Sequence, residues 1–240
     1  MLAGEEMKIC RVRIEDKKYI ENEESFIHNT AFIARDNSVI SVFEYKIKTH
    51  QKAEIINFKF FKDCDEGKIL SEFIDELKYW NPYISLIECK EGIIDSQLLK
   101  SLNFIKNHIW RYQVRGALKI FKININEIVP EQLTVDEEKI KKALKWIKGP
   151  EDIVISCVKI NNKIVCIDGY TRLVAAYKKG FKYVYGYYEE TDDTEFYEVC
   201  LKWCEAEKIT SIKDLSNRIV SPKEHEKLWI NRCKNYLNET

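Results

Sequence analysis

The sequence lacks three features that would each indicate a particular class of protein. Its 39 basic and 39 acidic residues give no net charge, so no overall field steers the chain to nucleic acid or a membrane. No run approaches the ~20 consecutive apolar residues of a membrane span. The first ten residues, MLAGEEMKIC, have neither the basic nor the apolar region of a signal peptide. We therefore expect a soluble, cytoplasmic protein with no membrane partner.

The sequence also lacks the spacing of a zinc site or a redox motif. Its eight cysteines include no Cys-x-x-Cys pair, and only four histidines are present. Cys200 and Cys204 lie four residues apart on a predicted helix, which is too few ligands for a structural zinc ion. Without an export signal, we expect reduced thiols that act as small buried hydrophobic residues. The sequence thus predicts no metal site.

The most informative stretch is Ile164 to Gly180, IVCIDGYTRLVAAYKKG. A short apolar run predicts a buried strand, Asp168-Gly169 predicts a turn, and Thr171 can cap the helix that follows. Such a turn collects free backbone N–H groups at the positive end of a helix, which favours an anion such as phosphate. Arg172 adds a fixed positive charge. The predicted phosphate-binding residues are Gly169, Tyr170, Thr171 and Arg172.

Length and patterning indicate two α/β (α+β) domains and a helical tail. At 240 residues, about two domains are expected. In residues 1–116, strands are expected at 7–14, 31–34, 39–48, 54–61, 83–89 and 104–114, and helices at 69–80 and 96–102. In residues 117–190, a strand, a capped helix, a hairpin turning at Asn161-Asn162, the turn described above and a last strand follow. Residues 191–240 are predicted to be helical.

The order of elements across residues 7–115 resembles the GNAT acyltransferase fold, and the segment LLKSLNFIK (98–106) is similar to the family's segment before its last strands. The resemblance implies a CoA pyrophosphate loop at residues 62–68, where Gly67 and Lys68 match the expected glycine-rich, basic pattern. Asp63, Asp65 and Glu66 would repel a polyanion there. Leu99 stands where the family often has a tyrosine general acid, and the candidate bases are Glu54 and Glu88.

Residues 120–190 resemble the ParB/sulfiredoxin superfamily, through IVPEQ (128–132), the capped helix, the hairpin and CIDGYTRLVAAYKKG. The resemblance implies a nucleotide-phosphate turn at Gly169-x-x-Arg172-x-x-Ala175, with ATP, ADP or CTP and Mg²⁺ as cofactors. Sulfiredoxins place their catalytic cysteine where this chain has Tyr170. Free-serine kinases share Asp-Gly-x-x-Arg, and their catalytic glutamate aligns with Gln132, one residue after Glu131.

These patterns favour a small-molecule phosphotransferase that resembles the free-serine kinases. Glu131, expected to be exposed in a loop, or Asp168 would accept the proton of a hydroxyl-bearing substrate, while Arg172 stabilises the transferring phosphoryl group. His225 is expected to be a solvated residue, and Leu228, Trp229 and Tyr236 are expected to dock the tail on the second domain or on a second subunit in a homodimer.

Two alternatives remain open. One is an N-acyltransferase that uses acetyl-CoA in the first domain. The other is a non-catalytic nucleotide-sensing or DNA-associated module. Residues 191–240 carry eight basic and ten acidic residues, which makes nucleic acid an improbable partner.

Overall fold

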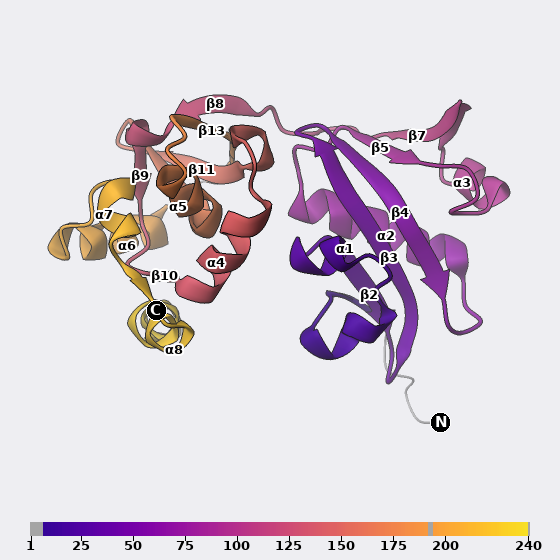
Figure 1. Ribbon diagram of the computed structural model, residues 1–240, viewed down its shortest axis with the longest axis horizontal. Helices are drawn as coiled ribbons and strands as arrows, with labels where there is room; N and C mark the ends of the chain where they lie inside the picture. Colours follow the sequence, from indigo (N-terminus) through magenta and orange to yellow (C-terminus); the bar gives the residue numbers. More distant parts are fainter. Residues whose placement is uncertain (1–6, 192–193, 240) are drawn as a thin grey trace. The chain divides into compact units, whose positions relative to one another are not determined.

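The computed structural model describes residues 7–191 and 194–239 and divides into two compact units, Met1–Leu118 and Lys119–Thr240 (Figure 1). The first six residues of the segment examined for a signal peptide lie outside the described part. Both units combine helices with a mixed sheet, which confirms the expected α/β class. Within the described ranges, no helix is long and apolar enough to cross a membrane.

The first unit is built on a seven-stranded sheet in the order β1-β2-β3-β4-β5-β7-β6. All neighbouring strands are antiparallel except β4 and β5, which run parallel. The strands are β1 (Lys8–Arg11), β2 (Ala31–Arg35), β3 (Val39–Thr49), β4 (Lys52–Phe60), β5 (Leu86–Cys89), β6 (Ile105–Asn107) and β7 (Ile109–Gln113). The helices are the 3₁₀ segment η1 (Ile14–Tyr19), α1 (Glu23–Ile27), α2 (Glu66–Trp80) and α3 (Ser96–Ser101).

Helix α2 supplies one side of the core of the first unit. Its apolar residues recur at helical spacing and are buried against aromatic residues of β2 and β3. The rings of Phe43 and Phe73 stack with centroids 5.2 Å apart. The helix ends at Asn81, because the Pro82 that follows disfavours a helical conformation at that residue. The helix expected at 69–80 is therefore confirmed, with one additional turn at its start.

Strand β5 is shorter than β4 and pairs with it along its whole length. They pair over Lys52–Ile55 and Leu86–Cys89, whereas β4 continues to Phe60 alongside β3 alone. Farther on, the single strand expected at 104–114 is a hairpin of β6 and β7. The chain reverses at His108, whose φ is +63°. The alternation of apolar and polar residues, from which the strand was predicted, gives no sign of this turn.

The second unit contains a five-stranded sheet in the order β8-β13-β11-β12-β9 and a short parallel pair of β10 and β14. Asn161 and Asn162 have φ of 50° and 62°, which confirms the predicted two-residue hairpin turn. The strands are β8 (Phe121–Asn124), β9 (Ile128–Pro130), β10 (Val135–Asp136), β11 (Val154–Ile160), β12 (Lys163–Asp168), β13 (Tyr183–Tyr188) and β14 (Ile219–Val220).

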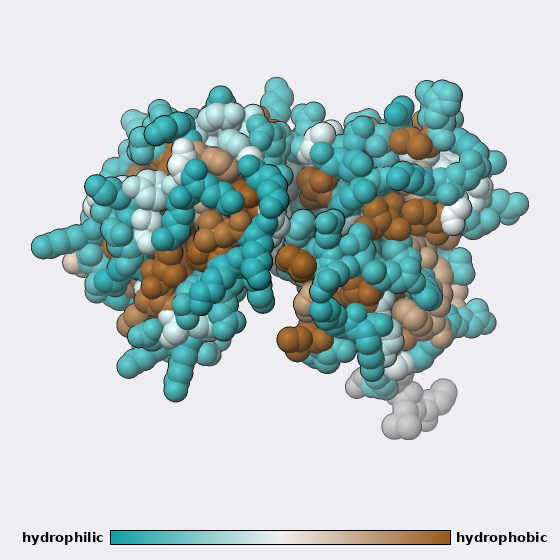
Figure 2. Space-filling model, viewed as in Figure 1, coloured by the Kyte–Doolittle hydropathy of each residue, from teal (hydrophilic) through white to brown (hydrophobic). Residues whose placement is uncertain are grey.

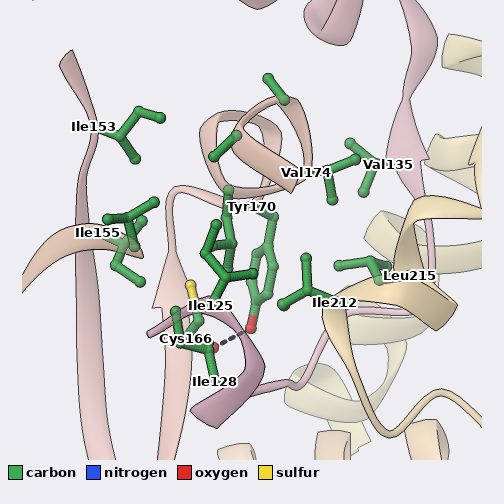
Figure 3. Close-up of a cluster of buried hydrophobic side chains, with 14 of the residues drawn as sticks. Ile125, Ile128, Val135, Ile153, Ile155, Cys166, Tyr170, Val174, Ile212 and Leu215 are labelled. Carbon is green, nitrogen blue, oxygen red and sulfur yellow. Dashed lines mark hydrogen bonds between the residues drawn. The ribbon is translucent and has the colours of Figure 1, made fainter. Parts of the chain in front are cut away.

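The helices of the second unit share one core with its sheet, and those after residue 194 contribute to it (Figure 3). Trp229, expected to dock the tail, is buried and meets Trp203 edge to face with centroids 6.4 Å apart. The helical segments are η2 (Ile125–Glu127), α4 (Glu137–Trp146), η3 (Pro150–Asp152), α5 (Tyr170–Lys178), α6 (Glu195–Ala206), α7 (Ile212–Ser216), α8 (Pro222–His225), the π-helical turn η4 (Glu226–Ile230) and α9 (Asn231–Glu239).

One buried carboxylate fixes the segment that connects η1 to α1. Glu44 on β3 is fully buried and accepts hydrogen bonds from the backbone N–H groups of Glu21 and Asn22, at 3.0 Å each. Its Oε1 also accepts a 2.7 Å bond from Asn57 Nδ2. Three donors compensate the loss of water around this charge.

We predict that Glu44→Gln lowers the free energy of unfolding by roughly 1–3 kcal/mol, because an amide nitrogen would face backbone donors that need an acceptor. Glu91→Gln is the control, since Glu91 is an exposed residue paired with Lys106, and the change should stay within about 0.5 kcal/mol. Urea denaturation of both variants measures the difference. Equal stabilities would show that the three bonds of Glu44 contribute nothing.

Candidate functional site

The predicted turn between β12 and α5 is present. Strand β12 ends at Asp168, Gly169 has a φ of +100°, and α5 begins at Tyr170. A Cβ atom at Gly169 would lie 2.9 Å from Cγ2 of Ile155, so both the conformation and the close packing require glycine. No side chain caps this helix start, in contrast to α4 and α2. The first N–H groups of α5 therefore remain available to a ligand.

The turn opens into a cavity of about 240 Å³. Its walls come from the turn itself, from the start of α4 and from the C-terminal helical segment, which brings together residues far apart in the sequence. The lining residues are Gln132, Asp136, Lys139, Ile167, Asp168, Gly169, Tyr170, Thr171, Arg172, His225 and Ile230. All four predicted phosphate-binding residues and Asp168 are among them, whereas Glu131 is not.

Two cationic and two anionic side chains line this cavity. Arg172 donates to Asp168 across 3.2 Å, and its Nε is buried without a hydrogen-bond partner. Asp136 is engaged as the N-cap of α4, where its Oδ1 accepts from the N–H groups of Glu138 and Lys139 at 2.8 and 3.1 Å. The guanidinium and the Lys139 ammonium are thus the groups that can meet an anion.

His225 is the neutral titratable group of the cavity. Its side chain is buried, not solvated as the sequence indicated, and its Nδ1 lies 2.9 Å from Oγ1 of Thr134. Burial lowers the pKa of this imidazole, and the nearby Lys139 lowers it further. An uncharged imidazole at neutral pH can accept a proton.

Tyr170 contributes only its backbone to the cavity. Figure 3 shows its ring in the core, with Ile125 on one side and Ile212 on the other, and its hydroxyl directed toward Cys166. Its hydroxyl donates to the carbonyl oxygen of Cys166 and accepts from the N–H of Glu131 at 3.0 Å. The predicted phosphate contact of Tyr170 can therefore involve only its N–H group. Cys166 is buried, as expected.

Glu131 is not the exposed loop residue that the sequence indicated. Only 4% of its surface is exposed, and its Oε2 has no hydrogen-bond partner. Burial raises the pKa of this carboxyl to about 8. The next residue, Gln132, faces the cavity instead and donates to the carbonyl oxygen of Thr134 at 2.6 Å. Glu131 therefore cannot meet a ligand in the cavity without a change of structure.

The candidate bases of the first unit are buried in ion pairs. Glu54 Oε2 lies 3.2 Å from Lys46 and 3.1 Å from Lys48, and its Oε1 lies 3.2 Å from Lys90. Burial alone would raise the pKa of Glu54, but the lysines outweigh it and lower the pKa to about 2. A base with so low a pKa is a poor proton acceptor at neutral pH.

Glu88 is also buried and paired with two cationic side chains. Its Oε1 lies 3.2 Å from Lys52 and 3.1 Å from Arg111. The two glutamates are direct neighbours in the parallel register of β4 and β5. The sequence indicated solvated carboxylates at both positions, and the structure contradicts this.

The loop expected to hold a CoA pyrophosphate is already neutralised. Asp65 caps α2 by accepting from the N–H of Lys68 at 2.9 Å, so a carboxylate occupies the place of an anion. Lys62 pairs with Asp36 at 3.1 Å, and the Lys68 ammonium lies 3.9 Å from Glu72. Gly67 lies within the first turn of α2, beside the capping carboxylate. These contacts disfavour a polyanion at Gly67 and Lys68.

No family model and no curated protein matches the chain. Similar solved structures include Ard1 of Thermoplasma volcanium, at 9% identity over 45% of this chain and 97% of that one, with a TM-score of 0.38. The ribosomal-protein-S18-alanine N-acetyltransferase of Escherichia coli matches at 14% identity over 42% and 79%, with a TM-score of 0.34. The candidate N-acetyl transferase YhhK of Escherichia coli, solved bound to coenzyme A, matches at 14% identity over 45% and 99%, also at 0.34.

Scores this low do not assign an activity. The resemblance of residues 7–115 to the GNAT acyltransferases and that of residues 120–190 to the ParB/sulfiredoxin superfamily therefore stay predictions. Across residues 7–191 and 194–239, no three His, Cys, Asp or Glu side chains are arranged to hold a metal ion.

We predict that Glu131 makes the second unit less stable as the pH rises. Its pKa is about 8 in the folded state and about 4.3 when unfolded, so the unfolded state releases the proton first. The stability due to this group is complete below about pH 4.3 and falls as the pH rises through 8. Between pH 5 and pH 8 the free energy of unfolding should decrease by roughly 2–4 kcal/mol.

Glu131→Gln should remove most of this decrease, whereas Glu138→Gln, at an exposed position of α4, should leave it intact. Denaturation curves at both pH values for the three proteins measure the effect. The same pH dependence in wild type and Glu131→Gln would mean that Glu131 ionises freely in the folded protein.

Proposed function

We propose that the second unit binds a phosphate-bearing small ligand in the cavity at Asp168–Arg172 and transfers its phosphoryl group to a hydroxyl acceptor. The observation that carries the proposal is the uncapped start of α5, which opens beside Arg172 into the same cavity as Lys139 and His225. Backbone N–H groups at a helix start and a guanidinium are both favourable partners of a phosphate oxygen.

The size of the cavity suits the phosphate end of a ligand. At about 240 Å³ it is smaller than the 300–1,000 Å³ typical of sites that enclose a drug-sized molecule. A nucleotide such as ATP, ADP or CTP would insert its phosphates and leave its base outside. Asp168, a mostly exposed carboxylate at the rim, fits the one or two carboxylates with which proteins hold a phosphate-bound Mg²⁺.

His225 takes the proton-accepting role that the sequence suggested for Glu131. It lines the cavity, its pKa is lowered by burial, and its Nδ1 is held by Thr134. A neutral imidazole can accept the proton of an attacking hydroxyl while Arg172 stabilises the transferring group. The acceptor is a small hydroxyl-bearing molecule.

We predict that Arg172→Ala weakens nucleotide affinity at least tenfold, because the guanidinium would contact phosphate in the bound state. His225→Gln should leave affinity nearly unchanged and lower turnover by about 10²–10⁴, the usual range for a general base. Lys179→Ala, which removes one charge from the opposite end of α5, is the control and should change neither quantity. Calorimetry with ATP, ADP and CTP and a turnover assay with hydroxyl acceptors give both numbers.

Unchanged affinity in Arg172→Ala for every nucleotide would refute the phosphate site. Wild-type protein that binds a nucleotide and turns over none would refute the transferase and leave a nucleotide-sensing module.

A second candidate is an N-acyltransferase in the first unit, favoured by the part of β4 that continues after β5 ends. Beyond Ile55 and Cys89 the two strands no longer pair, so the facing edge of β4 can receive an extended ligand such as the pantetheine arm of acetyl-CoA. The low pKa of Glu54 and the capping role of Asp65 oppose this activity.

We predict that acetyl-CoA binds the protein with a dissociation constant above about 1 µM, because Asp65 occupies the helix start and its neighbours are acidic. The triple variant Asp63→Asn, Asp65→Asn, Glu66→Gln should bind at least tenfold more tightly, since asparagine still caps α2 without the charge. Calorimetry on both proteins measures the two dissociation constants. Sub-micromolar binding by the wild type would favour the acyltransferase over the phosphotransferase.

A further inference from the structure

The cavity at Asp168–Arg172 contains several groups that suit an anion. Arg172 and Lys139 are cationic, and the Nε atom of Arg172 is buried without a hydrogen-bond partner. The N–H groups at the start of α5 have no side-chain cap. A guanidinium, an ammonium and the N–H groups of a helix start are each favourable partners of a phosphate oxygen. Several independent groups of the cavity therefore suit a phosphate chain.

Two polar side chains of the cavity that could bind the edge of a nucleotide base are engaged elsewhere. The amide nitrogen of Gln132 donates to the carbonyl oxygen of Thr134 at 2.6 Å. Asp136 Oδ1 accepts from the N–H groups of Glu138 and Lys139 at 2.8 and 3.1 Å. These bonds engage the amide donor and a carboxylate oxygen in holding the start of α4 and the loop before it. Hydrogen bonds to the base edge are one of the two means by which proteins recognise a base.

The second means is stacking on an aromatic ring, and the cavity offers no exposed ring for it. Among the described residues that line the cavity, Tyr170 is the only tyrosine, tryptophan or phenylalanine, and its ring lies in the core. The ring of His225 is buried and bonded to Thr134. At about 240 Å³, the cavity has room for a phosphate chain but not for a nucleoside as well.

We propose that the phosphoryl donor is recognised through its phosphate chain alone, so that inorganic pyrophosphate or tripolyphosphate replaces a nucleotide. This inference rests on the proposed phosphotransferase function of the cavity. With pyrophosphate, the hydroxyl oxygen of the acceptor forms a bond to one phosphorus, and the bridging P–O bond breaks. Orthophosphate leaves with the bonding electron pair, while His225 takes the hydroxyl proton. The products are a phosphate monoester of the acceptor and orthophosphate.

The size of the effect separates a site that binds the base from one that does not. A site built to hydrogen-bond part of a substrate rejects an analogue without that part by on the order of 10⁴–10⁵. Where the base makes no such bond, its removal leaves every contact with the phosphate chain in place. The affinity for tripolyphosphate should therefore lie within about tenfold of the affinity for ATP or CTP.

The test is calorimetry of the full chain with inorganic tripolyphosphate, ATP and CTP, each in the presence of Mg²⁺. We expect three dissociation constants within about tenfold of one another. Arg172→Ala should weaken the binding of all three by a similar factor, whereas the control Lys179→Ala, at the other end of α5, should change none. A turnover assay with a panel of hydroxyl acceptors should show phosphorylated acceptor and orthophosphate when pyrophosphate is the donor.

ATP or CTP that binds more than tenfold more tightly than tripolyphosphate, or turns over where the inorganic donors do not, would overturn this inference and leave the phosphotransferase in place. Tripolyphosphate binding that is equally strong in Arg172→Ala would lie outside the cavity and would also overturn it. A wild type that binds none of the three, or turns over no donor, would refute the proposed function and the inference together. The comparison of donors in the wild type does not depend on the folding of any variant.

Discussion

The second unit depends on one buried hydroxyl. Tyr170 begins α5, and its ring lies in the core, where its hydroxyl joins the end of β12 through Cys166 to the end of β9 through Glu131. Because the hydroxyl satisfies a buried carbonyl and a buried N–H at once, its removal would leave both without a partner. The position of the turn, and with it the free helix start, follows from this contact.

The buried glutamates of the two units have opposite electrostatic surroundings. In the first unit Glu44 accepts hydrogen bonds from two backbone N–H groups and from Asn57, and three lysines lower the pKa of Glu54 to about 2. In the second unit Glu131 has only weak donors, and its raised pKa shows that burial favours the neutral acid there. A charged carboxylate stabilises a sheet face, whereas a neutral one near pH 7 can exchange a proton. Figure 2 shows polar side chains over much of the visible surface of both units, whereas these three glutamates are each at most 4% exposed.

Local patterns were sufficient for much of the fold. The turn at Asp168–Arg172, the Asn161-Asn162 hairpin and the burial of Cys166 each follow from a few adjacent residues, and all three predictions are confirmed. The burial of Glu131 and His225 could not be predicted, because alternation separates the two faces of a segment without saying which becomes covered. His225 meets Thr134 across 91 positions of sequence, a distance over which the pattern of one helix carries no information. The lysines around Glu54 come from the register of three strands, which a single strand does not encode.

The parallel pairing of β10 with β14 affects how the second unit reaches its folded state. Val135 pairs with Ile219, and the cavity takes two of its walls from residues on either side of this pair. During synthesis, the sheet and α5 leave the ribosome well before α8 and η4, so the nascent unit first exposes an apolar surface where Trp229 will later pack. Contacts that span so much sequence also slow folding, because the chain must close a long loop before it gains them. The step that completes the ligand cavity is therefore among the last in folding.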